Sequence, residues 1–227
     1  KKIRHKLFLS STANWFFSDL KPKNFSIKKS SLNKRLEIFI ELLTNKTISK
    51  QFTYKFKLDK KYYHLAKTIL PKGPIYIGFS PGAGDESKKW PLEKFLKLAN
   101  SQVKQKRVPV FFLGPQEKHL LELIKKEVTT AIFPEWTNDA INSGLKGPLL
   151  VIALAKQVHI SIANDSGTGH MLAVGGSKLI SLFSKHNPIK YAPNAEKLII
   201  IDSKNWGGTN PDLIPIKEVE KSINKLV

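Results

Sequence analysis

Residues 163–170, which read ANDSGTGH, have the composition of a loop that could hold a phosphorylated ligand. They leave a predicted strand and enter a predicted helix, and the amides of residues 166–169 would form the positive start of that helix. This is a natural seat for a diphosphate. Asp165 would repel such an anion, so it either accepts hydrogen bonds from sugar hydroxyls or caps the helix. His170 either donates to the phosphates or packs against the fold.

A second loop, residues 80–91, reads SPGAGDESKKWP and also joins a strand to a helix. Small residues such as Ala83 and Gly84 let a ligand approach the backbone, whose amides can hold phosphate oxygens. Lys88 or Lys89 would add a positive charge to that site. The alternative is an ordinary glycine-rich turn with solvated lysines. The pattern fits neither a dinucleotide-binding fingerprint nor a P-loop.

A third loop, residues 113–117, reads LGPQE and again follows a strand. Glu117 could accept hydrogen bonds from ribose hydroxyls. A carboxylate in the first turn of a helix is an equally good explanation, because the helix dipole favours an acid there.

The elements that must position these loops alternate between strands and helices. Apolar runs predict strands at 74–79, 108–113, 129–133, 159–163, 178–183 and 198–201. Helical spacing predicts one helix that begins near residue 91 and four more at 116–126, 148–157, 168–174 and 215–227. Such alternation predicts an α/β fold, with a parallel sheet covered on both faces. Ligands bind beyond the carboxyl ends of such strands, so the three loops should converge at one edge.

Residues 1–72 have a different pattern. Helices are predicted at 36–43 and 62–70, and an exposed strand at 52–58. The run PKGP at 71–74 makes a stiff joint and a plausible domain boundary. We therefore predict two parts, residues 1–72 as the remnant of one α/β domain and residues 73–227 as a second, ligand-binding domain.

The charge of the chain is strongly positive and unevenly spread. The formal net charge is +20; residues 1–72 hold 18 basic and 4 acidic side chains (+14), and the rest hold 20 and 14 (+6). Two explanations of this uneven charge stay open: residues 1–72 face an anionic partner, or the composition of the chain is biased toward lysine. Arg4, Arg35 and Arg107 are the only arginines, which speaks against sequence-specific nucleic-acid binding.

Several chemistries lack their residues. The chain has no cysteine, and no Asp-x-Asp pattern is present to hold a metal on a sugar diphosphate. His159 and His170 have no obvious third ligand, so no metal site is expected. The longest apolar run is far shorter than the roughly 20 residues that cross a bilayer, and no signal peptide is evident. We expect a cytoplasmic protein, with peripheral contact at the inner membrane face as an option.

The same stretches, taken together, resemble a known family. Residues 81–83 and 88–91, then 113–117, then 164–170, then 182–183, follow each other in the order and spacing of the heptosyltransferases, glycosyltransferase family 9. Residues 34–70 resemble, more faintly, the end of that family's N-terminal domain.

The resemblance implies a GT-B type enzyme, with two facing Rossmann-like domains and the active site between them. It implies a nucleotide-sugar donor, typically ADP-heptose, a phosphorylated lipopolysaccharide-type acceptor, and no separate cofactor or metal. By position, Lys88, Asp165 and His170 match residues at the reacting phosphates and sugar. The donor-binding positions that match are Ala83, Gly84, Lys88, Glu117 (or Gln116, if the alignment shifts by one), Asp165, Ser166, Gly167, Thr168 and His170.

Two departures from the family pattern matter. The opening strand and the Gly-Asp turn that carries the proposed general base have no counterpart here, so we expect an incomplete N-terminal domain and little sugar transfer. Gly169 stands where many relatives carry a bulkier residue, which leaves the donor sugar open.

The chemistry implied is an inverting, metal-independent sugar transfer by a monomer. A sugar-nucleotide epimerase of similar fold, a basic nucleic-acid-binding protein and a non-catalytic nucleotide binder remain as alternatives. An epimerase would need further acid and base residues, and a nucleic-acid binder would need exposed aromatic residues among its lysines.

Overall fold

The structure is a computed structural model that describes residues 6–11, 15–23, 30–47 and 57–227. The chain forms two compact units. The smaller unit holds Lys1–Lys55 with Ile189–Tyr191, and the larger holds Phe56–Pro188 with Ala192–Val227. Each unit is described by itself below.

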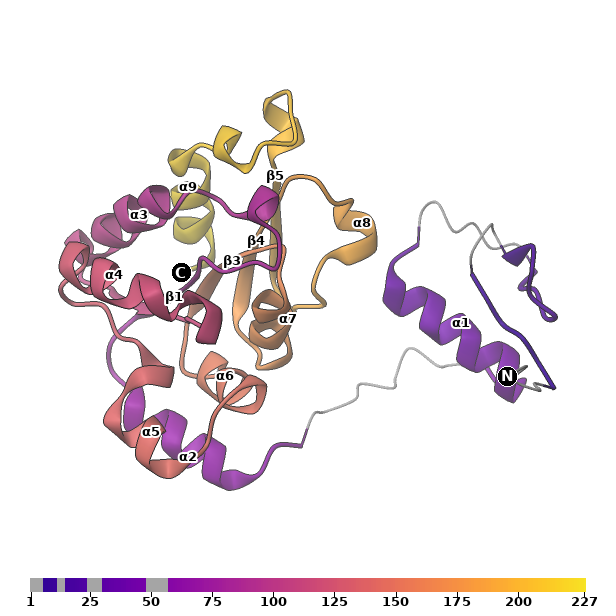
Figure 1. The fold of residues 1–227 in the computed structure, drawn as a ribbon, viewed down its shortest axis with the longest axis horizontal. Coiled ribbons are helices and arrows are strands. Elements are labelled where there is room, and N and C mark those ends of the chain that lie inside the picture. The colour runs from indigo at the N-terminus through magenta and orange to yellow at the C-terminus, as the bar shows by residue number, and fades with distance from the viewer. Residues whose placement is uncertain (1–5, 12–14, 24–29, 48–56) are drawn as a thin grey trace. The chain divides into compact units, whose positions relative to one another are not determined.

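The larger unit is built on one parallel sheet of five strands (Figure 1). Its order is β2-β1-β3-β4-β5, and each neighbouring pair runs parallel, for example with Gly78 beside Ser161. All carboxyl ends therefore lie at one edge, as the sequence predicts. The strands are β1 (Tyr76–Ser80), β2 (Val108–Phe111), β3 (Ile160–Asn164), β4 (Lys178–Phe183) and β5 (Leu198–Asp202).

Helices cover both faces of this sheet, and each face has its own apolar core. Alternate residues of β1 show the division, because Ile77 and Phe79 enter one core while Tyr76 enters the other. The first core is closed by α3 (Leu92–Lys104), α4 (Leu121–Glu127) and α9 (Ile216–Leu226). The second is closed by α2 (Lys60–Ile69), α5 (Asn138–Ser143), α6 (Pro148–Ala155) and α7 (Gly167–Val174). An α/β sandwich of this kind confirms the predicted fold class.

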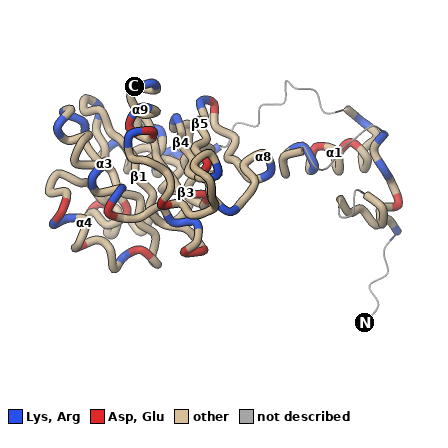
Figure 2. Tube along the Cα trace, turned by 90° about the horizontal axis from the view of Figure 1, so that it is seen from above, with Lys and Arg blue, Asp and Glu red and all other residues tan. Residues whose placement is uncertain are grey.

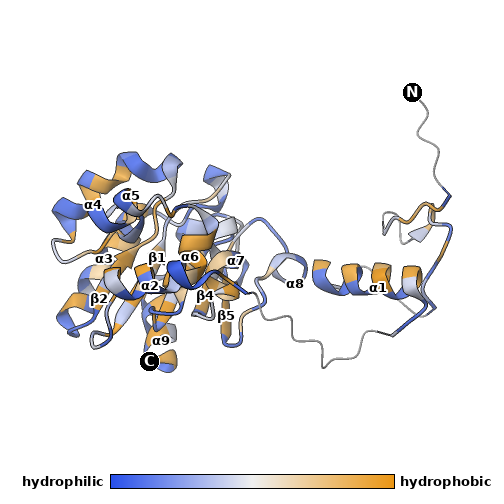
Figure 3. Ribbon diagram, turned by 90° about the horizontal axis from the view of Figure 1, so that it is seen from below, coloured by the Kyte–Doolittle hydropathy of each residue, from blue (hydrophilic) through white to orange (hydrophobic). Residues whose placement is uncertain are grey.

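Helix α6 is apolar all round, which fits its position (Figure 3). Six of its eight residues are buried, and it packs on both α2 and α7. The approach to α7 is close at Gly175, where an added Cβ would lie 2.3 Å from the carbonyl oxygen of Ile152. A side chain at this position would force the backbone of α6 to shift, so the close packing of the two helices requires glycine.

Short turns complete the larger unit at its carboxyl edge and between its helices. The 3-10 turns are Glu86–Lys88, Pro115–Leu120, Pro134–Trp136, Ser203–Trp206 and Pro211–Leu213. A one-turn helix, α8 (Pro188–Tyr191), follows β4, and its residues Ile189–Tyr191 are grouped with the smaller unit. The first two 3-10 turns lie within the loops that the sequence singles out.

The strand predicted at 129–133 is wrong, because only Ile132 pairs with Val110, as an isolated bridge, before Pro134 turns the chain into a 3-10 turn. The domain division predicted at 71–74 stays a prediction; helix α2 itself packs against α5 and α6 in the larger unit. Of the strand predicted at 52–58, residues 52–56 lie outside the described residues, and 57–58 are not in a strand.

The smaller unit is organised around α1 (Leu32–Thr44), the helix predicted at 36–43. Ser31 caps it by accepting a hydrogen bond from the backbone N–H of Lys34 at 3.1 Å. Trp15 is buried, and its ring centroid lies 4.8 Å from that of Phe39. Helix α1 also carries large apolar residues that are exposed in this unit: Leu32, Leu36, Ile40 and Leu43 (Figure 3).

Charged residues are interspersed along the chain of the larger unit (Figure 2). Basic and acidic positions follow one another on α3, α4 and α9. Among the residues described, no helix has both the length and the apolar character needed to cross a membrane.

Candidate functional site

A buried asparagine joins two of the three loops. Asn164, at the end of β3, accepts a hydrogen bond from the backbone N–H of Trp90 at 3.1 Å. Its amide nitrogen donates to the carbonyl of Pro81 at 2.8 Å. The Trp90 ring is also buried and donates to the carbonyl of Ile214 at 3.0 Å. The loop after β1 is therefore held at both of its ends beside the end of β3.

Between those ends, the loop places Lys88 against Asp165. The Lys88 ammonium lies 3.3 Å from the Asp165 carbonyl oxygen and 3.5 Å from its carboxylate oxygen Oδ2. Both side chains are mostly buried, with exposed fractions of 16% and 10%. The sequence predicts both residues at one site, and the structure brings them into contact. Neighbouring Lys89 pairs with Glu86 instead.

A fourth loop, after β4, reaches the same place. His186 brings its Nδ1 to within 2.7 Å of Asp165 Oδ2. Ser184 donates a hydrogen bond to the carbonyl of Ser87 at 3.2 Å, and Lys185 lies 3.9 Å from Asp85. Sequence reasoning missed this loop. Its position was implied by the prediction that 178–183 is a parallel strand of the same sheet.

The loop after β3 presents the start of α7. Ser166 is the residue before the helix, its side chain makes no capping bond, and the first turn contains no acid. The first amides of α7 therefore have no side-chain acceptor from this loop, which is the arrangement that binds anions. Gly167 and His170 are exposed and Thr168 is half-buried. Within the described part of the chain, no hydrogen bond or ion pair is seen for the His170 side chain.

On the other side of the edge, Glu117 lies over two glycines. An added Cβ on Gly82 would be 2.6 Å from Glu117 Oε1, and one on Gly114 would be 3.0 Å from Oε2. The observed position of the Glu117 carboxylate therefore requires glycine at both positions, because a side chain on either residue would collide with it. It lines a cavity of about 310 Å³ together with Pro81, Glu86, Lys89, Trp90, Pro91, Leu92, His119 and Leu120. Gln116, the alternative to Glu117, is exposed.

A second acid, Glu135, lies close to Glu117. Its Oε2 is buried without a hydrogen-bond partner among the described residues. Burial raises the pKa of this carboxyl to about 8; its own N–H and that of Leu113 oppose the shift, and the charge of Glu117 adds to it. The adjacent Trp136 ring donates to the carbonyl of Leu113 at 2.9 Å, which fixes this turn at the end of β2.

Electrostatics therefore differ along the edge. Near Lys88, carboxylates meet cations, and hydrogen bonds from the Ser87 backbone and side chain lower the pKa of Asp85.

Of the predicted residues, Ala83 is buried and Gly84 is exposed with open space around it. Sequence reasoning missed Asn164, His186 and Glu135 as contributors. In the described segments there is no cluster of three His, Cys, Asp or Glu side chains suited to a metal ion.

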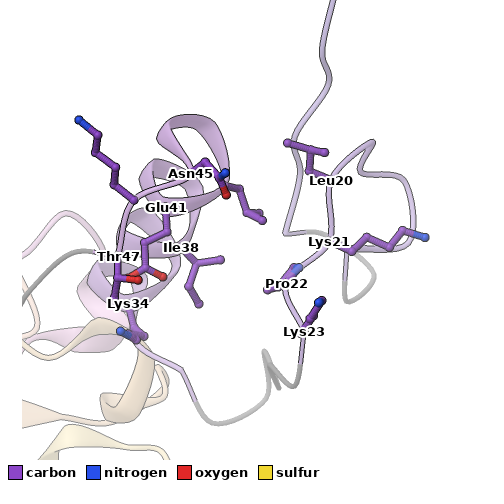
Figure 4. A pocket seen from close by; sticks show the side chains of 11 residues that line it. Leu20, Lys21, Pro22, Lys23, Lys34, Ile38, Glu41, Asn45 and Thr47 are labelled. Atoms are coloured by element: carbon purple, nitrogen blue, oxygen red, sulfur yellow. The ribbon is translucent and has the colours of Figure 1, made fainter.

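A larger cavity than the one beside Glu117 lies elsewhere, in the smaller unit. It measures about 570 Å³, and Figure 4 shows Ile38 of α1 and Pro22 on opposite sides of it. Its lining includes Lys21, Lys23 and Lys34. None of the residues predicted for the site lines this cavity, so it is not part of the candidate site.

Comparisons with known proteins point in one direction. Residues 13–212 match the sequence profile described as glycosyltransferase family 9 (heptosyltransferase). The chain is 29% identical over 154 residues to the lipopolysaccharide core heptosyltransferase OpsX of Haemophilus influenzae. That match covers 67% of this chain and 43% of OpsX.

Solved structures share the fold. A family 9 glycosyl transferase from Veillonella parvula superposes with a TM-score of 0.73 at 18% identity, covering 91% of this chain and 62% of that chain. The ADP-heptose LPS heptosyltransferase II of E. coli gives a TM-score of 0.66 at 18% identity, covering 89% and 63%. The predicted GT-B type fold is confirmed. This chain thus spans about two fifths to three fifths of the length of these relatives.

Proposed function

This chain belongs to glycosyltransferase family 9, the heptosyltransferase family, and we propose that it forms the nucleotide-sugar-binding part of such an enzyme. The donor in this proposal is ADP-heptose or a close analogue, and the acceptor is a phosphorylated glycolipid of the lipopolysaccharide core. The names of OpsX and of the E. coli relative support both choices. The observation that carries the proposal is the contact of Lys88 with Asp165 beside the open start of α7.

The reaction proposed is an inverting transfer without a metal. An acceptor hydroxyl oxygen forms a bond to the anomeric carbon, and the bond from that carbon to the diphosphate oxygen breaks. The proton of the hydroxyl passes to a general base, which we place outside the described residues. Negative charge grows on the departing diphosphate, and Lys88 with the first amides of α7 stabilises it.

Each remaining residue has a proposed role. The backbone at Ala83 and Gly84 approaches the donor closely, and Ser166, Gly167 and Thr168 supply amides to the diphosphate. His170 donates to the same phosphates. Asp165 accepts hydrogen bonds from the sugar hydroxyls, since a carboxylate is unsuited to a phosphate contact. Glu117 accepts from the ribose hydroxyls at the neighbouring cavity.

Titration calorimetry of the chain with ADP, ADP-heptose and adenosine tests this function. We expect heat for ADP and ADP-heptose and a much weaker response to adenosine, because the diphosphate supplies the charge that Lys88 binds. The absence of heat with every nucleoside diphosphate and its sugar conjugates would disprove the proposal. Transfer to acceptor by this chain alone is expected to be slow, because the base is placed elsewhere.

We also propose that the protein acts in the cytoplasm, as a monomer, against the inner leaflet. The net charge of +14 in residues 1–72 supports the contact with the inner leaflet. Each lysine near an anionic surface contributes about 1 kcal/mol to the free energy of membrane binding. Co-sedimentation with vesicles tests the idea. Equal binding to neutral vesicles and to vesicles with anionic lipid would exclude it.

The alternatives have no comparable support. The relatives described above are heptosyltransferases, and none is an epimerase or a nucleic-acid-binding protein. Product analysis with and without acceptor separates transfer from epimerisation.

A further inference from the structure

A tight turn in the smaller unit presents two phenylalanines to solvent. The backbone N–H of Ser18 donates to the carbonyl of Trp15 at 3.0 Å, so Phe16 and Phe17 are the two central residues of the turn. They are 70% and 63% exposed, whereas Trp15 and Ser18 are 2% and 6% exposed. Trp15 packs on Phe39 of α1. We call residues 15–18 the phenylalanine turn; both of its ends are buried and both of its central rings face outward.

Hydrogen bonds between the flanking residues hold this turn in place. Asp19 donates its backbone N–H to the carbonyl of Phe8 at 2.9 Å, and its carboxylate accepts the N–H of Phe8 at 2.6 Å. The Ser18 hydroxyl group accepts the N–H of Ser10 at 2.6 Å and donates to the Ser10 carbonyl at 2.7 Å. Residues 8–10 and 18–19 therefore lie side by side, and the exposed rings have a defined position.

The folded unit gains little stability from these two rings. Phe16 and Phe17 contact each other edge to face, with ring centroids 5.1 Å apart, and most of each side chain is in contact with water. Tight turns favour glycine, proline, asparagine, aspartate and serine, none of which exposes an apolar ring. Adjacent exposed aromatic residues instead mark a surface that contacts a protein partner or a membrane.

The charge around the phenylalanine turn favours the membrane. Lys6, Lys21 and Lys23 are exposed, and the Lys21 ammonium group lies 5.7 Å from the centroid of the Phe16 ring. In the sequence, residues 1–30 hold eight basic side chains and one acidic side chain. The headgroups of an anionic membrane place negative charge directly above an apolar layer. Aromatic rings flanked by lysines match both parts of that boundary.

We propose that the phenylalanine turn docks this chain on a bilayer that contains anionic lipid. Phe16 and Phe17 enter the interfacial region, and Lys21 and Lys23 bind the headgroups. This inference rests on the proposed function, in which the acceptor is a glycolipid of such a membrane, and it assigns the contact to particular side chains. Insertion removes apolar area from water, and the lysines add an attraction that salt weakens.

Co-sedimentation of the full chain with vesicles tests the proposal. One preparation contains phosphatidylcholine alone, and the other also contains phosphatidylglycerol. Phe16→Ser combined with Phe17→Ser is expected to weaken binding to the anionic vesicles at least about tenfold, because the apolar area then stays out of the bilayer. Ile141→Ser is the matched control, because Ile141 is 60% exposed on α5 of the larger unit. It should bind within about twofold of the unmodified chain.

Phe16→Trp reports insertion without removing a ring. Anionic vesicles should shift its fluorescence, measured as the difference from the four native tryptophans, to shorter wavelength, and brominated lipid should quench it. Ile141→Trp should show neither change. Lys21→Gln combined with Lys23→Gln should weaken binding to anionic vesicles about tenfold and leave binding to neutral vesicles unchanged. An indole at position 16 that stays in water on bound vesicles would contradict the proposal.

The outcomes separate this inference from the function on which it rests. If ADP gives no heat, the proposed function fails, and the vesicle assay still decides the role of the turn. If the unmodified chain binds anionic vesicles and the double serine variant binds them equally well, only the role of the turn is refuted. A competing occupant is a second copy of the chain. A dimer in analytical ultracentrifugation that the two serine substitutions convert to a monomer would also overturn the proposal.

Discussion

The two sides of the sheet's carboxyl edge differ in how they treat carboxylates. On the side of β3 and β4, Asp165 has Lys88 and His186 within 3.5 Å. On the side of β2, Glu117 and Glu135 lie near each other, and no ion pair with a lysine, arginine or histidine is seen for either within the described chain. The first side neutralises its acid, whereas the second keeps one acid protonated by burial.

This difference matches the two halves of the proposed donor. A diphosphate requires positive charge and backbone amides, and these are found beside Lys88. A ribose offers hydroxyl donors, and carboxylate oxygens such as those of Glu117 accept them. The same sheet edge thus provides opposite chemistry on either side of β1, and variants on the two sides should fail in different ways.

The largest expected effect is on the cationic side. Lys88→Ala should slow sugar transfer by the complete enzyme about a hundredfold, close to 3 kcal/mol, because one donor to the leaving diphosphate is lost. It should also weaken binding of both ADP and inorganic pyrophosphate. Lys97→Ala, on the exposed face of α3, is the control and should change neither. Loss of less than tenfold in turnover would contradict the assignment of Lys88.

Glu135→Gln probes the acidic side through stability. The pKa of Glu135 is raised to about 8, so between pH 4.5 and 8 the folded protein holds a proton that the unfolded chain has released. The unfolding free energy of the unmodified chain therefore falls as pH rises through this window. Glutamine carries no such proton. Its advantage over glutamate should grow by about 1.4 kcal/mol for each pH unit between pH 4.5 and pH 8.

Chemical denaturation at pH 5 and pH 8 measures that difference. Asp139→Asn, a nearby exposed acid on α5, serves as the control and should show no comparable pH dependence. An advantage for Glu135→Gln that is the same at both pH values would show that Glu135 is ionised in the folded protein.

The smallest effect is expected from Gly82→Ala. The new Cβ would lie 2.6 Å from Glu117 Oε1, and the flexible end of that side chain would move away. ADP affinity should fall about fivefold, near 1 kcal/mol, while pyrophosphate affinity stays unchanged. Lys97→Ala, on the exposed face of α3, serves again as the control and should leave both affinities as they are. If Gly82→Ala lowered the affinities for ADP and pyrophosphate equally, the proposed division of the sheet edge into a ribose side and a diphosphate side would be contradicted.

Much of the fold was predictable because its signals are local. Five predicted strands are confirmed within a few residues, since buried parallel strands are short apolar runs between loops. The strand at 129–133 failed because β-pairing depends on a partner, and only Ile132 meets one. Helix α5 was missed although Thr137 caps it and Gly144 ends it at a φ of 69°, because six residues give too little periodicity.

The site was predictable in outline and not in its connections. Loop positions follow from strand ends, so the meeting of Lys88 with Asp165 could be expected. The role of Asn164 could not, because its partners Pro81 and Trp90 lie 83 and 74 residues away in sequence. His186 and Glu135 depend likewise on contacts between loops, for which a single sequence carries no periodic signal.

The buried Asn164 has a consequence for kinetics. Since its two hydrogen bonds hold the loop after β1 before any ligand arrives, folding has already met the entropy cost of ordering that loop. Nucleotide should therefore associate in a single fast phase, without a slow isomerisation, and variants of the site should differ mainly in how quickly the ligand leaves.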